Sequence, residues 1–191
     1  MSFSATKLAI PGVCVIAATR HSDARGNFME TYRAGAFAEF GLPPQFVQDN
    51  QILSSRAGTI RGLHFQAPPF AQAKLVRVLR GAIFDVAVDI RTGSPTFGKW
   101  VGASLSAAAG NQLYIPAGFA HGYSTLEPET DVAYKCDAYY AAAAEGGILF
   151  SDPAIGIEWP YSPGDAILSE RDRALPLLEA ISSPFVMAGR R

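Results

Sequence analysis

Short segments that suit β-strands recur along the chain, separated by turn residues. Residues 74–80 and 82–90 are rich in β-branched side chains and flank Gly81, which predicts two strands joined by a tight turn. Strands repeated at such short intervals favour a sandwich or a barrel over alternating strand–helix units. Further strands are expected at 5–18 (broken by Pro11-Gly12), 27–32, 46–50, 100–106, 111–116, 121–127 and 131–140.

Helix is predicted at only two places. Residues 34–41 suit a short helix that ends at Gly41, and a second helical region is expected near 169–180. No linker, low-complexity tract or run of charge divides the chain. We therefore expect one domain over residues 1–191, long enough to bury a core without disulfides.

The stretch 58–66 carries the most informative polar residues. On an extended strand His64 and Gln66 point the same way, whereas Arg61 faces oppositely unless Gly62 forms a β-bulge. A guanidinium, an imidazole and an amide among apolar residues indicate a lined pocket. A lone histidine in such a strand is, however, also typical of a packed core.

The overall charge excludes some classes of partner. The formal net charge is −1 and the isoelectric point is near 6.3, which argues against a general nucleic-acid or membrane-surface binder. Cys14 and Cys136 are too few for a disulfide framework and are expected to be buried small residues. With no targeting segment or membrane-length apolar run, we expect a soluble cytoplasmic protein.

Two spacings resemble the cupin signature. Residues 110–121 carry Gly110, Pro116, Gly118 and His121 at the spacing of one half, and Gly58 followed by His64 fits the opening of the other. The resemblance implies a mainly β fold, the double-stranded β-helix or jelly roll, with both histidines directed into the barrel.

The metal-binding part of that signature is incomplete. Many cupins have a second histidine where this chain has Gln66, and a glutamate in the window where Ala71 and Lys74 stand. A cation beside Lys74 would also be repelled. We therefore expect no metal site.

A longer, ordered set of motifs is more specific and spans residues 5–178. The motifs are Asp23-x-Arg25-Gly26, Phe46-Val-Gln-Asp-Asn50, Arg61-Gly-Leu-His-Phe-Gln66, Ala71-Gln-Ala-Lys74-Leu-Val-Arg77, Phe84-Asp-Val-Ala-Val-Asp89, Ser94-Pro-Thr-Phe-Gly98, Ile115-Pro-Ala-Gly-Phe-Ala-His-Gly122, Tyr134-Lys135, Tyr139-Tyr140 and Gly156-Ile-Glu-Trp-Pro160. With these motifs the chain resembles the dTDP-4-dehydrorhamnose 3,5-epimerases, and the resemblance implies a dTDP-4-keto-6-deoxy sugar as substrate.

The family's chemistry inverts C3 and C5, which both adjoin the C4 ketone. It needs a base on one face, an acid on the opposite face and a group that stabilises the enolate. The resemblance therefore implies that no cofactor is required. The resemblance implies that His64 is the base, paired with Asp172, and that Tyr134 is the acid. Lys74 matches the residue near the C4 oxygen.

The resemblance also implies a binding site and a homodimer, in which some side chains reach across the interface. Arginines suit diphosphate, and Tyr139 offers a ring on which thymine can stack. The residues that match positions in the family's nucleotide-sugar site are Arg25, Phe28, Glu30, Gln48, Asp49, Asn50, Arg61, His121, Tyr139, Glu145 and Arg171.

Some positions allow a second interpretation. Asp172 lies three residues after Ser169, a spacing that is also typical of a helix capping box.

The chain departs from the family's usual sequence at two places. Gln51-Ile52-Leu53 stands where the family usually has His-Ser, which makes the segment one residue longer, and the Arg171 position is often lysine in relatives. These two departures bear on substrate choice.

Alternative functions follow from the same residues. The first is a mono-epimerase or ketoisomerase of a related sugar pathway, since such relatives share the scaffold. A metal-dependent cupin enzyme is opposed by Gln66, and a silent sugar-binding cupin is opposed by the set His64, Lys74, Tyr134 and Asp172.

Overall fold

The computed structural model describes residues 2–42 and 45–187, and within these ranges most of the regular structure is β-strand. The strands are β1 (Phe3–Lys7), β2 (Cys14–Ala18), β3 (Arg20–Asp23), β4 (Gly26–Met29), β5 (Gln48–Ser54), β6 (Ile60–Gln66), β7 (Lys74–Arg80), β8 (Ala82–Asp89), β9 (Trp100–Ser106), β10 (Gln112–Ile115), β11 (Phe119–Thr125), β12 (Thr130–Cys136) and β13 (Glu145–Gly147). The helices are α1 (Ala34–Glu39) and α2 (Glu170–Arg173), with single 3-10 turns η1 (Ala142–Ala144) and η2 (Leu178–Ala180).

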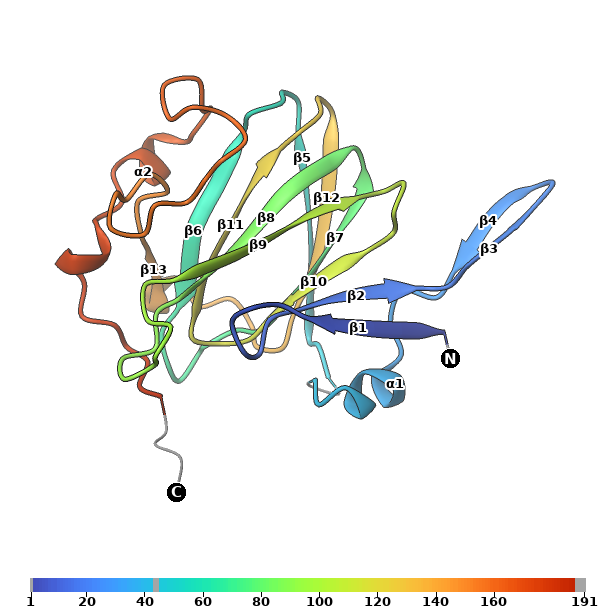
Figure 1. Cartoon of the computed structure of the whole chain (residues 1–191), viewed down its shortest axis with the longest axis horizontal. Coiled ribbons are helices and arrows are strands. Elements are labelled where there is room, and N and C mark those ends of the chain that lie inside the picture. Colours follow the sequence, from blue (N-terminus) through green and yellow to red (C-terminus); the bar gives the residue numbers. More distant parts are fainter. Residues whose placement is uncertain (1, 43–44, 188–191) are drawn as a thin grey trace.

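The strands form two large sheets and a separate hairpin (Figure 1). One sheet has the order β1-β2-β10-β7-β12-β5 and the other the order β13-β6-β11-β8-β9. Neighbouring strands in both sheets run antiparallel. Two such sheets packed face to face are the jelly roll expected from the cupin resemblance.

The main core lies between the two sheets. Val76 and Val132 come from the six-stranded sheet, and Ala87, Val101 and Tyr123 come from the five-stranded sheet; all five are buried in one cluster. Because β-strands direct alternate side chains to opposite faces, the residues that alternate with these along each strand point outward. Lys74 therefore lies on the same face of β7 as Val76, toward the space between the sheets.

The outer face of the five-stranded sheet is also covered. All seven residues of β11 are buried. Val86 and Val88 pack there against Ile148, Leu178 and Phe185 of the C-terminal third of the chain. This covering explains why β8 reads as an almost continuous apolar run, and it brings α2 beside β6.

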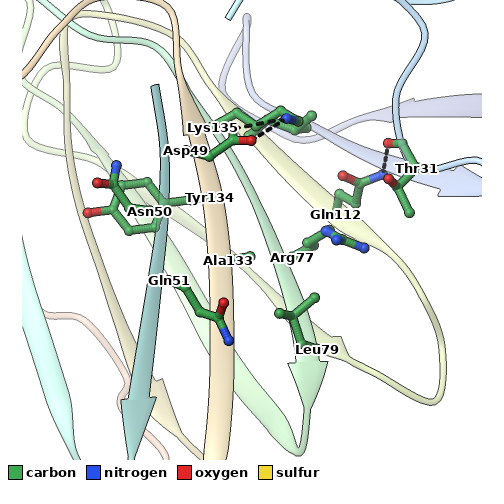
Figure 2. A pocket seen from close by; sticks show the side chains of 11 residues that line it. Thr31, Asp49, Asn50, Gln51, Arg77, Leu79, Gln112, Ala133, Tyr134 and Lys135 are labelled. Carbon is green, nitrogen blue, oxygen red and sulfur yellow. Dashed lines mark hydrogen bonds and ion pairs between the residues drawn. The ribbon is translucent and has the colours of Figure 1, made fainter. Parts of the chain in front are cut away.

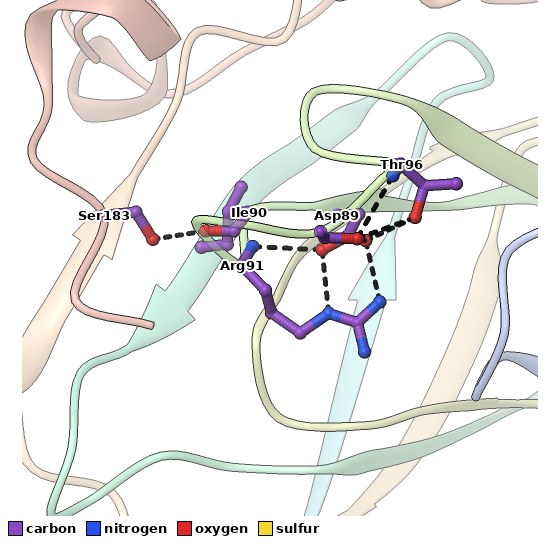
Figure 3. Close-up of polar contacts among 6 residues, drawn as sticks. Asp89, Ile90, Arg91, Thr96 and Ser183 are labelled. Atoms are coloured by element: carbon purple, nitrogen blue, oxygen red, sulfur yellow. Dashed lines mark hydrogen bonds and ion pairs between the residues drawn. The ribbon is translucent and has the colours of Figure 1, made fainter. Parts of the chain in front are cut away.

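The connection after β8 is fixed by a buried carboxylate (Figure 3). Asp89 accepts hydrogen bonds from the backbone N–H and the guanidinium of Arg91 and from the hydroxyls of Ser94 and Thr96. Ser183 donates to the neighbouring carbonyl of Ile90. The motif Ser94-Pro-Thr-Phe-Gly98 thus has a structural role in this turn.

The hairpin β3–β4 stands away from both sheets (Figure 1). Its base is anchored by Arg20, whose guanidinium donates to the carbonyls of Ala107 and Ala108. Phe28 is 70% exposed, which is unusual for so large an apolar side chain. The hairpin therefore presents an apolar and a charged surface to the outside.

Several predicted elements are shorter than expected; the strand expected at 27–32, for example, ends at Met29. Strand β12 ends at Cys136 instead of continuing to 140, since residues 138–141 bond to glutamine side chains and not to a neighbouring strand. Helix near 169–180 is limited to α2 and η2, because Pro176 between them has no N–H to donate. None of the described helices is both long and apolar enough to cross a membrane.

Candidate active site

A β-bulge in β6 turns Arg61 and His64 to the same face. His64 pairs with His121 and Arg61 with Tyr123, so three steps along β6 correspond to two along β11. Gly62 takes up the extra residue with a φ of 129°, and a Cβ there would lie 2.6 Å from the Cα of Gly122. The sequence left a bulge at Gly62 open as a condition; the bulge is present, and only glycine fits at its centre.

His64 is held by a carboxylate from α2. Its Nε2 lies 2.8 Å from Oδ1 of Asp172, whose other oxygen accepts from the N–H of Gly62 at 3.3 Å. Burial acts to raise the pKa of Asp172. The hydrogen bond and charge of His64, and the hydrogen bonds from Gly62 and Ser169, bring that pKa below its ordinary value. Asp172 is thus an anion at neutral pH, and the ring nitrogen of His64 turned away from it is the one free to accept a proton.

The Ser169–Asp172 spacing forms the helix cap, but only the serine half of a capping box. Ser169 is the N-cap of α2, and its hydroxyl accepts from the N–H of Asp172 at 3.0 Å. The side chain of Asp172 leads to His64 and not back to the start of the helix. The cap therefore orients the residue whose carboxylate orients His64.

Lys74 and Tyr134 approach from the opposite sheet. Lys74 pairs with Cys136, and Tyr134 pairs with Val76, so both point between the sheets. Loss of water lowers the pKa of Lys74, opposed by Cys136, Asp85 and Glu145 nearby. Burial chiefly raises the pKa of Tyr134, which keeps its phenol protonated and able to donate.

A second imidazole–carboxylate pair lies beside the first. Nε2 of His121 is 2.6 Å from Oδ1 of Asp85, and both residues are buried. Burial lowers the pKa of His121, while Asp85 opposes the shift. Asp85 was not among the residues singled out in the sequence; a carboxylate inside the apolar run 82–90 was the available signal.

His64, Lys74 and Tyr134 line one cavity of about 220 Å³ between the sheets. It brings together the predicted residues Gln48, Asn50, His64, Lys74, Tyr134 and Glu145, with Cys136, Tyr140 and Gln72, which sequence reasoning did not assign to a site. Of the adjacent pair Tyr139-Tyr140, the sequence reasoning assigned only Tyr139 to the site. Gln66 lines the cavity too, but its amide is occupied by backbone partners.

The cavity mouth carries a charged cluster. Oε2 of Glu145 accepts from the hydroxyl of Tyr140 at 2.7 Å and from Arg171 at 2.8 Å. Burial alone would raise the pKa of Glu145, but Arg171 and Tyr140 lower it. Arg61 points to the same side of β6 as His64 but does not line this cavity, and its Nε donates to the hydroxyl of Ser54. Tyr139 is 69% exposed on the segment beside the mouth.

Four predicted binding residues lie elsewhere. Arg25 and Phe28 are on the projecting hairpin, and Glu30 follows it, paired with Arg33 at 2.6 Å. Asp49 points to the outer face of the six-stranded sheet, where it pairs with Lys135 at 2.9 Å (Figure 2). In that view Asn50 and Tyr134 extend to the other side of the same strands.

Within residues 2–42 and 45–187, no three His, Cys, Asp or Glu side chains gather as a ligand set. A histidine–carboxylate pair opposite a buried phenol, with an ammonium in the same cavity, can remove and return a proton at carbon beside a carbonyl. Fold and site together define an acid–base enzyme built in a cupin jelly roll.

Comparison with known proteins agrees with this class. The model of the family described as dTDP-4-dehydrorhamnose 3,5-epimerase matches residues 7–180. The enzyme of that name from Sinorhizobium fredii is 51% identical over 171 residues, which cover 90% of this chain and 87% of that protein. This chain belongs to the dTDP-4-dehydrorhamnose 3,5-epimerase family and is therefore an isomerase.

Solved structures give the same fold. The crystal structure of the dTDP-6-deoxy-D-glucose-3,5-epimerase of Legionella pneumophila, in complex with dTDP-4-keto-L-rhamnose, has a TM-score of 0.92 and 41% identity, and the match covers 98% of this chain and 100% of that chain. A 3'-monoepimerase from Streptomyces bikiniensis in complex with dTDP-quinovose has a TM-score of 0.84 and 36% identity, covering 90% of this chain and 86% of that chain. The predicted jelly roll is confirmed.

Proposed function

We propose that the chain inverts C3 and C5 of dTDP-4-dehydro-6-deoxy-D-glucose to give dTDP-4-dehydro-L-rhamnose, in dTDP-L-rhamnose biosynthesis. The observation that carries the proposal is the cavity that His64, Lys74 and Tyr134 line together, with Asp172 held against His64. Membership of the family supports this substrate, and so does the relative from Legionella pneumophila with dTDP-4-keto-L-rhamnose bound.

Each inversion is a proton exchange that needs no oxidant or reductant. His64 takes the proton from the carbon beside the ketone, and the C–H electron pair forms the enolate, whose charge lies on the C4 oxygen. The ammonium of Lys74 stabilises that charge, and Asp172 stabilises the imidazolium. Tyr134 then donates its hydroxyl proton to the same carbon from the opposite face. The resulting phenolate regains a proton, and His64 releases one, so the net change is an isomerisation.

Proton NMR in deuterated water, without added metal, tests the proposal. With dTDP-4-keto-6-deoxyglucose, deuterium should enter both C3 and C5, and a reductase should trap the rhamnose product. Exchange at one carbon would instead identify a mono-epimerase, the class to which the Streptomyces bikiniensis relative belongs. Absence of exchange would contradict both.

We also propose a homodimer in which the β3–β4 hairpin completes the site of the other copy. The side chain of Arg25 is 91% exposed and Phe28 is 70% exposed, and the hairpin projects away from both sheets of its own chain (Figure 1). A guanidinium and an aromatic ring suit the diphosphate and the base of a nucleotide sugar.

Mixing two inactive variants tests the hairpin's role. His64→Ala lacks the base but keeps the hairpin, and Arg25→Ala keeps the base but lacks the hairpin guanidinium. If the hairpin acts on the other copy, co-expression creates dimers with one intact site and restores activity. Activity that stays at the level of the single variants would show that the hairpin does not act across a dimer.

We place this function in one domain over residues 1–191 in the cytoplasm. Cys14 and Cys136 are both free thiols, which suits a reducing compartment. Secretion of the native chain into the periplasm of its source cell would contradict this location, and cell fractionation is the measurement.

A further inference from the structure

The segment that carries Tyr139 and Tyr140 is held by glutamine side chains. Gln72 donates its amide to the carbonyl of Ala138 at 2.8 Å. Gln48 accepts from the N–H of Tyr140 at 2.8 Å. Gln66 donates to the carbonyl of Tyr139 at 3.2 Å and accepts from the N–H of Ala141 at 2.7 Å. Each of the residues 138–141 therefore has a backbone group bound to a glutamine.

Gln66 is the central member of this set. It is 5% exposed at the end of β6, and its Nε2 also donates to the carbonyl of Phe70 at 2.7 Å. Both N–H groups of its amide are thus used on carbonyl oxygens, and its oxygen faces an N–H, so only one orientation of the amide fits. Gln66 joins two loops that have no strand neighbour at this point.

The rings of Tyr139 and Tyr140 depend on that backbone for their position. They are 69% and 55% exposed, so little packing fixes them directly. The hydroxyl of Tyr140 bonds Glu145 at the cavity mouth, and Glu145 pairs with Gln66 in the β13–β6 ladder. A buried amide thereby links the strand of His64 to an exposed aromatic surface beside the cavity.

We propose that Gln66 is a positioning residue whose amide fixes residues 139–141 and so places the Tyr139 and Tyr140 rings to bind the nucleotide end of the substrate. This inference rests on the proposed function, which supplies the nucleotide. It gives the amide, at the position where other cupins have a second histidine, a role in binding the substrate in place of metal ligation. Because Gln66 acts through the tyrosines, its loss should weaken nucleotide binding and spare proton transfer.

Gln66→Glu is the first test. The carboxylate has nearly the same shape but directs an oxygen at the carbonyls of Tyr139 and Phe70, which then lose their donor. Amide hydrogen exchange at Tyr140 and Ala141 should become faster. The Kd for dTDP and the KM for the dTDP-sugar should both rise about tenfold or more, while kcat for exchange at C3 and C5 changes less than about threefold.

A matched control separates this effect from a general loss of stability. Gln112 is 2% exposed and also donates its amide to a backbone carbonyl, that of Thr31 at 2.8 Å, but it lies on β10. Gln66→Met removes three hydrogen bonds to backbone groups and Gln112→Met removes one, and neither variant buries a charge, so both should fold if Gln66→Glu does not. Only Gln66→Met should speed exchange at 139–141 and weaken dTDP binding.

Three outcomes would overturn the inference. Unchanged exchange and unchanged dTDP affinity in the Gln66 variants would mean that the amide does not position the segment. A fall in kcat at constant KM would place Gln66 in the chemical step instead. If the wild-type chain neither binds dTDP nor exchanges the sugar protons, the proposed function itself is wrong, and the inference fails with it.

Discussion

His64 and His121 lie directly opposite each other on β6 and β11, and each imidazole is held by its own carboxylate. The two pairs differ in their access to the cavity. The side chain of His64 is 29% exposed, whereas that of His121 is 8% exposed. Burial lowers the pKa of His121, which makes it the weaker base, and His64 but not His121 lines the cavity, which supports His64 as the proposed base.

Asp172→Asn should lower kcat by about 10²- to 10⁴-fold with a small change in KM, because the amide cannot stabilise the imidazolium of His64. Steady-state kinetics with the dTDP-sugar measure this. Glu170→Gln is the control, since Glu170 is an exposed residue of the same helix. A variant with at least half of the parent kcat would contradict the assigned pair.

Asp85→Asn should move the alkaline limb of the kcat–pH profile to lower pH. Burial lowers the pKa of Lys74, and Asp85 is one of the charges that oppose this shift. Removing that charge lowers the pKa of Lys74 further, so the ammonium that stabilises the enolate is lost at lower pH. Asn keeps an oxygen toward His121 and preserves the shape of the pair.

Asp131→Asn is the control for the Asp85 variant. Asp131 lies on β12 and accepts from Gln51, an exposed residue of β5. The alkaline limb should stay in place for this variant. An unchanged profile for Asp85→Asn would mean that the Lys74 ammonium does not set that limb.

Tyr134→Phe should separate proton removal from inversion. His64 and Lys74 remain, so the wash-in of deuterium at the substrate carbons continues, but the donor on the opposite face is gone. We expect the rate of product formation to fall by about 10²-fold or more while exchange into unreacted substrate persists. NMR of the recovered sugar measures both. Epimerisation of both centres at the parent rate would exclude Tyr134 as the acid.

The sheets could be predicted because local alternation and β-branched residues decide strand formation. The same rule placed His64 and Gln66 on one face, and both line the cavity. The sequence could say only that Arg61 would share a face with His64 if Gly62 formed a bulge. Whether it does depends on the approach of Gly122 from another strand.

Contacts distant in sequence could not be derived from local pattern. The His64–Asp172 bond joins residues 108 positions apart, and the spacing Ser169–Asp172 alone indicates only a cap. The family resemblance identified the pair, and the fold then gave it a geometry. The glutamines that end β12 early have no periodic signal, because their partners are backbone groups of an irregular segment.

Gly62→Ala should destabilise the fold by about 3 kcal/mol or more. The φ of Gly62 is 129°, and an added Cβ would lie 2.7 Å from the carbonyl oxygen of His121, a backbone atom that cannot rotate away. Urea unfolding followed by tryptophan fluorescence measures the change. Gly164→Ala, with open space around its Cβ, should stay within about 0.5 kcal/mol. Equal effects at both sites would contradict the close approach.

Asp89→Asn should make the free energy of unfolding less dependent on pH below 4. Burial acts to raise the pKa of Asp89, but its bonds from Arg91, Ser94 and Thr96 bring it down to about 2 from an ordinary value of 3.8 (Figure 3). A carboxylate with a lowered pKa stabilises the fold above its unfolded pKa, and this contribution is lost as pH falls toward 2. The contribution is about 2 kcal/mol, so the difference in unfolding free energy between the parent and Asp89→Asn should shrink by that amount between pH 6 and pH 2.

Arg91→Met should remove part of the same pH dependence, because Arg91 supplies three of the bonds to the carboxylate of Asp89. If the difference stays constant with pH, Asp89 does not titrate at an altered pKa, and the turn after β8 is held by shape alone.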